Sequence, residues 1–575
     1  MADLAAPVRR ALQDAFDALE PGADPVLASS DRADLQANGA LALAKRLGLE
    51  PSGVARAVLE KLDLSGVCEP AVVSGPGFIN LNFKNSYLES QLAAMAEDDR
   101  LGVARVDHAE NVVVDYSAPN VAKEMHVGHL RTTVIGDSLS RMLTFLGQRV
   151  MRQNHIGDWG TPFGMLIEHL IDIGEAEAAN ELSVGDLTTF YQQARSSFDS
   201  DDDFRDRSRQ RVVLLQSGDA ETLRLWRLLV GESVRYFDAV YEKLGVLLTD
   251  DDLMGESFYN SMLPEVVAEL DAKGLLVEHE GAKCVFPPGF LNRNGDPLPL
   301  IIQKSDEGFG YASTDLAAIR YRATVLQASR LLYVVGAPQA QHLQMCFAVA
   351  RMAGWLSEGT EAVHVAFGNV LGEDRRMLKT RSGETVRLVD LLDEAVERAS
   401  AALAKRAPED SQGASSEDES VARMVGIGAV KYSDLSTDRI KDYVFDWDRM
   451  LAFEGNTGPY IQYAHARIRS VFRRGEVSVP DAGPPRLTDP YERALGLALL
   501  RFSEALAETI EVYGPQKLCA YLFDVASTFT SFYENCRVLV PEEEVRMSRL
   551  RLCDLTARVL ELGLGLLGIE APQHM

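Results

Sequence analysis

The sequence is poor in cysteine, and the few cysteines are widely spread. Six cysteines occur in 575 residues, and no two form a CxxC pair. A zinc ribbon needs such pairs and a disulfide scaffold needs a higher density, so both are excluded. We expect buried, reduced thiols and no metal site. The six are Cys68, Cys284, Cys346, Cys519, Cys536 and Cys553.

Long apolar runs are also missing. No stretch approaches the ~18 consecutive apolar residues that cross a membrane. Near the N-terminus, Asp3, Arg9 and Asp14 interrupt the pattern, while Val8 and Leu12 recur at helical spacing. A signal peptide does not have this pattern. We therefore expect a cytoplasmic protein with no membrane segment.

Positive charge is in short supply. Lysine and arginine number 58 against 85 acidic residues, a net charge of −27. Contact with nucleic-acid phosphates usually needs a basic face. Net charge does not fix the local sign of one groove. If this chain binds a nucleic acid, it must concentrate its basic residues on one side.

The length predicts about three or four domains, at roughly 150 residues each. Residues 1–107 form a first unit, in which helical patterns come before an alternating, strand-like stretch at residues 78–83. The charged run at residues 97–100 marks its exit. We expect an α+β domain here.

A second unit begins with the short apolar run at residues 112–115, which predicts a buried parallel strand. A helical pattern at residues 125–146 and a strand at residues 149–152 complete a βαβ unit. Similar strands recur at residues 331–335 and 364–367. The pattern predicts a doubly wound α/β domain over residues 108–400, split by a mostly helical insertion at about residues 175–300.

Beyond residue 400 the pattern changes. Residues 405–420 are polar and predict a flexible loop. From residue 421 the apolar spacing is helical, with one short strand-like stretch at residues 476–479. We expect a loop with stem helices over residues 401–455 and an all-α bundle over residues 456–575.

The sharpest local feature is His126-Val127-Gly128-His129, between the first strand and the long helix. Two histidines three residues apart share one helix face, and Gly128 lets a flat ligand approach the backbone. A helix N-terminus after a strand is a ready phosphate site. Imidazoles there can stabilise a triphosphate by position and charge alone. Taken alone, the tetrapeptide also fits core histidines or a metal site.

The surrounding sequence narrows these alternatives. The segment Asp115 to Thr133 resembles the first signature of class I aminoacyl-tRNA synthetases, in the form seen in arginyl-tRNA synthetases. Further segments resemble that family in the same order along essentially the whole chain. They lie at residues 154–164, 311–315, 339–342, 431–436 and 456–467.

The resemblance implies a class I synthetase fold and an arginine–tRNA ligase. Such an enzyme activates L-arginine with ATP and Mg²⁺ to arginyl-adenylate, then transfers it to the 3′ end of tRNA(Arg). A monomer is the family expectation. An alternative is a paralogue of the same fold, which serves as a resistant duplicate or supplies activated arginine to a small-molecule pathway.

The resemblance also implies an ATP site. His126, Gly128 and His129 would hold the phosphates, and the two histidines would stabilise the adenylation transition state. The KMSKS loop of class I enzymes is not matched at residues 375–383. Lys123, just before the histidine motif, would supply the missing catalytic charge. Lys379 and Arg381 are further candidates for phosphate contact.

Two more sets of residues follow from the resemblance. Asp315 would pair with the substrate guanidinium as a two-pronged contact that lysine cannot copy. The full arginine-binding set is Ala118, Pro119, Asn120, His129, Asn154, Tyr311, Asp315 and Gln339. The C-terminal bundle would bind the anticodon by stacking and edge contacts. The tRNA-binding candidates are Tyr460, Gln462, Tyr463 and Arg467. Residues 1–107 would contact the tRNA elbow.

Overall fold

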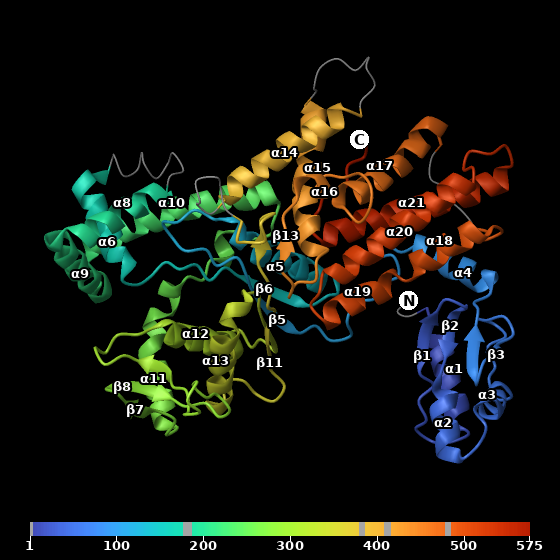
Figure 1. The fold of residues 1–575 in the computed structure, drawn as a ribbon, viewed down its shortest axis with the longest axis horizontal. Coiled ribbons are helices and arrows are strands. Elements are labelled where there is room, and N and C mark those ends of the chain that lie inside the picture. Colours follow the sequence, from blue (N-terminus) through green and yellow to red (C-terminus); the bar gives the residue numbers. More distant parts are fainter. Residues whose placement is uncertain (1–3, 176–186, 379–385, 407–415, 478–484) are drawn as a thin grey trace.

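The computed structural model describes residues 4–175, 187–378, 386–406, 416–477 and 485–575. Among them, no helix is both long and apolar enough to cross a membrane. The chain forms four units, one of which is inserted into another (Figure 1). They are a small N-terminal unit, a parallel-sheet unit, its insertion and a helical C-terminal unit.

The N-terminal unit has an antiparallel sheet in the order β1-β2-β4-β3. Gly77, with φ of +138°, turns the chain between the last two strands, and a Cβ there would lie 2.8 Å from the Pro51 carbonyl oxygen. The strands are β1 (Leu27–Ser30), β2 (Ala33–Ala37), β3 (Val72–Ser74) and β4 (Phe78–Leu81). The helices are α1 (Ala6–Asp17), α2 (Gly39–Leu47), α3 (Pro51–Leu59) and α4 (Asn85–Ala96).

The second unit is built on a parallel sheet in the order β11-β10-β5-β6. Val112, Val113 and Val114 of β5 are all buried because this strand is central and covered on both faces. The strands are β5 (Asn111–Asp115), β6 (Arg149–Gln153), β10 (Arg330–Tyr333) and β11 (Glu361–His364). The helices that bear on the site are α5 (Val127–Phe145), α12 (Tyr311–Arg320) and α13 (Ala340–Met352).

The chain between β6 and β10 leaves the sheet and returns (Figure 1). Its acidic run caps a helix: the Asp201 carboxylate accepts hydrogen bonds from the backbone N–H groups of Asp203 and Phe204. The helices are α6 (Pro162–Ile173), α8 (Leu187–Ser200), α9 (Asp202–Ser217), α10 (Ala220–Leu244) and α11 (Leu263–Ala272). Three antiparallel strands follow them, β7 (Val277–His279), β8 (Ala282–Val285) and β9 (Leu300–Gln303). The prediction of a mostly helical insertion missed this sheet.

The C-terminal unit is helical, and the N-terminal unit packs on it through α4 and α18 (Figure 1). An ion pair joins the two units here, with Arg493 Nη2 at 2.5 Å from Asp34 Oδ2. The helices are α14 (Leu388–Ala404), α15 (Ser416–Leu435), α16 (Trp447–Met450), α17 (Gly458–Gly475), α18 (Pro490–Leu500), α19 (Phe502–Glu511), α20 (Gln516–Asn535) and α21 (Glu543–Leu566).

Three local predictions need correction. Helix α15 begins at Ser416 because its first turn carries three acidic residues that favour a helix N-terminus, so the predicted loop at 405–420 is too long. The short parallel pair β12 (Val370–Leu371) and β13 (Tyr443–Val444) was not predicted. The strand-like stretch at residues 476–479 opens with Glu476, the left-handed residue that ends α17. Residues 478 and 479 lie outside the described part of the chain.

A buried guanidinium joins the carboxyl ends of the parallel strands. Arg322, in the short π-helical segment η3 (Tyr321–Val325) after α12, has a side chain that is 1% exposed. It donates to Asp115 at the end of β5 at 2.8 Å and to Gln153 at the end of β6 at 2.5 Å. Its guanidinium carbon also lies 5.1 Å from the ring centre of Tyr333 in β10. Arg322 thus fixes α12 against three strands.

We predict that Arg322→Met lowers the free energy of unfolding by about 3–5 kcal/mol, because it leaves the Asp115 carboxylate buried without its cation. The matched variant is Arg320→Met, two residues earlier, whose partner Glu269 is 36% exposed. That change should cost about 1 kcal/mol or less. Urea denaturation of both variants measures the difference, and equal losses would contradict the assigned role.

Candidate functional site

The loop after β5 carries unusual backbone conformations. Ser117, Ala118 and Ala122 have φ values of +72°, +48° and +58°. Side chains adopt this region at a cost, and such strain persists only where the surroundings impose it. Strained non-glycine residues cluster at functional sites.

Hydrogen bonds from neighbouring elements hold this loop in place. The Ser117 N–H donates to Thr132 Oγ1 at 3.0 Å, and its hydroxyl lies 2.8 Å from the Tyr241 hydroxyl. The Ala118 N–H donates to Asn154 Oδ1, and Asn154 Nδ2 donates to Tyr241, both at 3.0 Å. Helices α5 and α10 therefore both support the loop.

Asn154 supports the strained loop. The residue is 1% exposed, and each end of its side-chain amide makes a hydrogen bond within the protein. It therefore positions the Ala118 backbone, and its predicted role toward the amino-acid ligand stays a prediction. The sequence could not separate these roles, because both need an amide at the end of β6.

Ala118 and Asn120 are exposed, whereas Pro119 between them is buried. Gly157 pairs with this loop through two backbone hydrogen bonds. Its N–H donates to the Pro119 carbonyl, and its carbonyl accepts from the Val121 N–H. A Cβ at Gly157 would lie 2.3 Å from Asn120 Oδ1. The glycine therefore allows the two loops to meet.

The two histidines cap α5. The His126 N–H donates to His129 Nδ1 at 3.0 Å, and the Gly128 N–H donates to His126 Nδ1 at 3.0 Å. Because both Nδ1 atoms accept, each neutral ring carries its proton on Nε2. A Cβ at Gly128 would lie 2.7 Å from His126 Cε1, so only glycine leaves room for this ring.

Both histidines are held neutral. Burial and the nearby charge of Lys123 lower the pKa of His126. Burial, with a smaller contribution from His126, lowers the pKa of His129 to about 3. Two Nε2–H donors, the exposed Lys123 ammonium and the positive end of α5 therefore surround one place. This combination suits an anion such as a polyphosphate. Lys379 and Arg381 lie outside the described residues.

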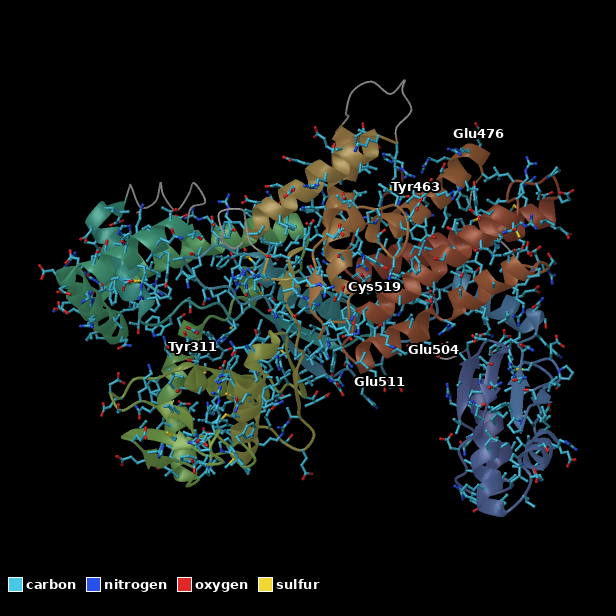
Figure 2. The ribbon with its side chains drawn as sticks, viewed as in Figure 1. Tyr311, Tyr463, Glu476, Glu504, Glu511 and Cys519 are labelled. Carbon is cyan, nitrogen blue, oxygen red and sulfur yellow. The ribbon has the colours of Figure 1, made fainter. Side chains whose placement is uncertain are left out.

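A second group of residues lies at the N-terminal ends of α12 and α13. Tyr311 opens α12 and is 77% exposed, and in Figure 2 it marks the end of α12 turned toward the insertion helices. Asp315, one turn on, lies 2.6 Å from His342 Nε2 through Oδ2. This hydrogen bond raises the pKa of His342. Gln339 is exposed at the start of α13.

Glu256 and Asp158 complete an acidic cluster with Asp315. Burial and the charges of Asp158 and Asp315 raise the pKa of Glu256 to about 7. Asp158 is fixed by the Ser257 N–H at 2.8 Å and the Ser257 hydroxyl at 2.6 Å. Three carboxyl groups that repel one another favour a cationic ligand. Sequence reasoning missed Glu256, which lies far from every recognised motif, and gave no role to His342, although it quoted the segment that contains it.

The histidine motif and the acidic cluster lie at the same edge of the sheet. Strands β5 and β10 are parallel neighbours, so the loops after them leave from the same end. Thr132 in α5 donates to the Val334 carbonyl at 2.6 Å, and the Glu256 N–H donates to the Ile156 carbonyl beside Gly157. The first contact ties α5 to the end of β10, and the second ties the segment of Glu256 to the loop after β6 that pairs with the strained loop.

The cysteines lie buried as separate thiols, as predicted. Cys346 comes within 4.8 Å of donor atoms on Asp315 and His342, a spacing that a metal could use. The short Asp315–His342 hydrogen bond already uses both of those groups, and burial raises the thiol pKa of Cys346 well above its usual value.

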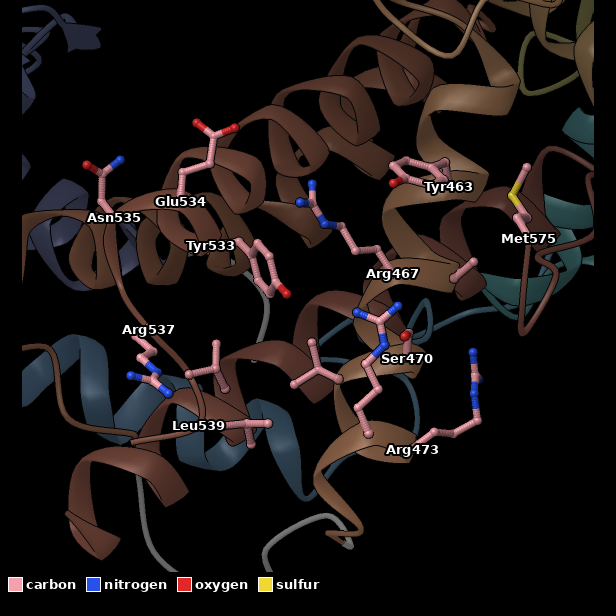
Figure 3. Close-up of a pocket in the computed structure, with 14 residues that line it drawn as sticks. Tyr463, Arg467, Ser470, Arg473, Tyr533, Glu534, Asn535, Arg537, Leu539 and Met575 are labelled. Carbon is pink, nitrogen blue, oxygen red and sulfur yellow. The ribbon is translucent and has the colours of Figure 1, made fainter. Parts of the chain in front are cut away.

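The C-terminal unit contains a cleft of about 670 Å³ between α17 and the end of α20. Figure 3 shows Tyr463, Arg467 and Arg473 on one side of this cleft and Tyr533 and Arg537 on the other. The Arg467 guanidinium carbon lies 4.5 Å from the Tyr533 ring centre. Four arginines against one glutamate make this cleft locally basic.

Two of the four predicted tRNA-binding residues lie elsewhere. Gln462 is fully buried, and its Nε2 donates to the carbonyls of Met424 and Glu570. Tyr460 packs against Phe523, and its hydroxyl lies 3.2 Å from that of Thr530. Both serve contacts between helices, because they face inward on α17.

Comparison with family models matches three regions of the chain. Residues 91–447 match the model described as tRNA synthetases class I (R), catalytic domain. Residues 461–575 match the DALR anticodon binding domain, and residues 2–83 match the arginyl tRNA synthetase N terminal domain.

Individual proteins agree with these matches. The chain is 56% identical to the arginine–tRNA ligase of Thermobifida fusca, over 100% of this chain and 99% of that one. It is 49% identical to that of a Nostoc species, over 99% and 98%. Arginyl-tRNA synthetase from Plasmodium falciparum superposes with a TM-score of 0.87 at 31% identity, and that from Thermus thermophilus with 0.82 at 26%, each covering both chains fully.

We predict that His129 stays neutral, with its proton on Nε2, from pH 8 down to about pH 4, because its pKa is lowered to about 3. Histidine-selective NMR reports both the tautomer and the titration, and a His129→Gln variant assigns the signal. A His129 signal that titrates near pH 6.5, or that carries its proton on Nδ1, would contradict the capping geometry.

Proposed function

The chain belongs to the arginyl-tRNA synthetases, and from that premise we propose how its own residues perform the ATP-dependent joining of arginine to tRNA(Arg). One observation carries the proposal. A helix N-terminus capped by two neutral histidines and a cluster of carboxyl groups are both anchored at the carboxyl ends of the parallel strands.

The phosphate groups of ATP would lie at the N-terminus of α5. His126 and His129 would donate from Nε2 to phosphate oxygens, and Gly128 would leave room for them. Lys123 would neutralise charge on the departing pyrophosphate. Lys379 and Arg381 remain candidates for the same task. The arginine carboxylate would attack the α-phosphorus of ATP. The bond between that phosphorus and the pyrophosphate oxygen would break, and arginyl-adenylate would form.

Magnesium would be held mainly by ATP itself. Asp115, the carboxylate that ends β5, already pairs with Arg322 at 2.8 Å. Phosphate oxygens and water are therefore the expected ligands of the ion. When bound, Mg²⁺ would neutralise phosphate charge.

The arginine side chain would enter the acidic cluster. Asp315, oriented by His342, would accept two hydrogen bonds from the guanidinium, and Glu256 would supply a second negative charge. A lysine ammonium cannot form the same two-pronged contact. Tyr311 and Gln339 would close the pocket from the exposed ends of their helices. Ala118, Pro119 and Asn120 would line the side nearer the reacting carboxylate, where Asn154 fixes the backbone.

The tRNA would contact both outer units. Tyr463 and Arg467, together with Tyr533 and Arg537, would bind the anticodon loop in the basic cleft of residues 456–575. Residues 1–107 would reach the tRNA elbow, residues 108–400 would carry catalysis, and residues 401–455 would connect them. We propose that the protein works as a monomer in the cytoplasm.

We expect the purified protein to charge total tRNA with labelled arginine in the presence of ATP and Mg²⁺. Asp315→Asn should lower kcat/KM for arginine by about a hundredfold or more, because a charged partner of the guanidinium is lost. The exposed Asp271→Asn in α11 is the matched control and should charge normally. Charging with a different amino acid would overturn the proposal.

The pH dependence tests Glu256. With a pKa of about 7, its carboxyl group is neutral below that pH and charged above it. We expect kcat/KM for arginine to rise between pH 6 and pH 8, since that ratio reports the free enzyme. Glu256→Gln should remove most of this rise and lower the plateau. An unchanged profile in the variant would exclude Glu256 from the pocket.

A further inference from the structure

The segment that carries Lys123 and leads into His126 has no helix or strand of its own. It is held instead by a separate part of the chain. The Val127 N–H donates to the Val386 carbonyl at 3.0 Å, and the Leu388 N–H donates to the Met125 carbonyl at 2.8 Å. His126 and Arg387 thus face each other in an antiparallel bridge.

A buried carboxylate strengthens this attachment. Glu124 lies between Lys123 and Met125, and its side chain is 6% exposed. Its Oε1 lies 3.3 Å from Arg387 Nη1, and its Oε2 accepts from the Thr188 hydroxyl at 3.2 Å. A buried carboxylate needs such partners, because without a cation its charge is strongly disfavoured.

Arg387 also pairs with a second carboxylate, that of Asp390. Its Nε and Nη2 donate to the two carboxylate oxygens of Asp390 at 2.6 and 2.9 Å, while Nη1 faces Glu124. The Asp390 side chain is 52% exposed. The guanidinium therefore bridges one surface carboxylate and one buried carboxylate, and only the buried one belongs to the phosphate-binding segment.

The insertion helix α8 holds the other side of the segment. Thr188 reaches Glu124, and the Lys123 ammonium lies 4.5 Å from the ring centre of Tyr191, one turn further along α8. At the start of the segment, the Ala122 N–H donates to the Ser233 hydroxyl of α10 at 3.0 Å. Residues 386–388 and the insertion therefore contact the segment of Lys123 and His126 from two sides.

We propose that Arg387 is a positioning residue for the phosphate-binding segment and acts through Glu124. It determines the positions of the Lys123 and His126 side chains relative to ATP and does not contact substrate itself. The proposal rests on the ATP site described under the proposed function. Removing Arg387 would take a cationic partner from the buried Glu124 carboxylate and weaken the attachment of the segment, so the segment would shift. Lys123 and His126 would move with it.

The test is steady-state arginine charging at varied ATP and at varied arginine. Arg387→Met should lower kcat/KM for ATP by roughly ten- to a hundredfold, the range expected for a small misplacement of catalytic groups. The KM for arginine should stay within about twofold. Arg387→Lys should recover part of the loss, because an ammonium can still face Glu124.

Asp390→Asn is the matched control. It removes the surface pair of Arg387 and leaves the contact with Glu124, so charging should be normal. A defect in this variant equal to that of Arg387→Met would overturn the proposal, as would an equal rise of the KM for ATP and the KM for arginine in Arg387→Met. Thr188→Val takes one hydrogen bond from Glu124 at a half-buried site, and carries the test if Arg387→Met does not fold. It should raise the KM for ATP alone.

A double variant tests the route through Glu124. In Glu124→Gln the buried charge is gone, so adding Arg387→Met should cost less than it does in the native protein. Full additivity would overturn the proposal. A native protein that charges no arginine would refute the proposed function instead, whereas normal ATP kinetics in Arg387→Met would refute only this inference.

Discussion

The contact between Arg322 and the ends of the parallel strands sets the geometry on which the site depends. Strand β5 leads into the histidine motif, and α12 carries Asp315, so the distance between the phosphate and guanidinium halves follows from how α12 sits on the sheet. The 2.8 Å pair with Asp115 and the contact with Gln153 fix that relation inside the protein. A guanidinium suits this task because its five donors lie in one rigid plane. An apolar contact would hold the layers together without fixing their rotation so narrowly.

The strained residues and the residues that hold them in place lie in different parts of the chain. The loop after β5 adopts left-handed conformations at Ser117, Ala118 and Ala122, which are costly for residues with a Cβ. The offsetting hydrogen bonds come from Thr132 in α5, from Asn154 just after β6 and from Tyr241 in α10. The loop therefore takes its shape from contacts with both the sheet unit and the insertion. Residues of the insertion, far along the sequence, thus support the segment that leads to the histidine motif.

The sequence predicted what is local and missed what is made by distant contacts. The α5 helix, its neighbouring strands and the place of His126, Gly128 and His129 at its N-terminus follow from spacing within a few residues, and the family and the ligase activity follow from motifs. The arginine-pocket and anticodon roles stay predictions. Glu256, in contrast, gains its raised pKa from burial and from the charges of Asp158 and Asp315, which lie far away in the sequence. Gln462 was placed at a surface, but tertiary packing buries it against Met424 and Glu570. The sheet β7–β8–β9 was missed, and its first strand, β7, is exposed at all three residues and so gives no buried apolar signal.

The acidic composition is less of an obstacle to RNA binding than the net charge suggests. Part of the negative charge is used locally: Asp201 caps α9, and Asp34, Glu124 and Asp137 are paired inside the protein. The basic residues are concentrated where the cleft of α17 and α20 brings together Arg467, Arg473, Arg474 and Arg537. At physiological salt the Debye length is about 8 Å, so a phosphate in that cleft is governed by the arginines beside it and is screened from acidic residues on remote faces. The same reasoning applies at the other end of the molecule. There the clustered carboxyl groups of Asp158, Glu256 and Asp315 would repel phosphate and favour a cationic group, so local charge again decides which ligand each part of the molecule suits.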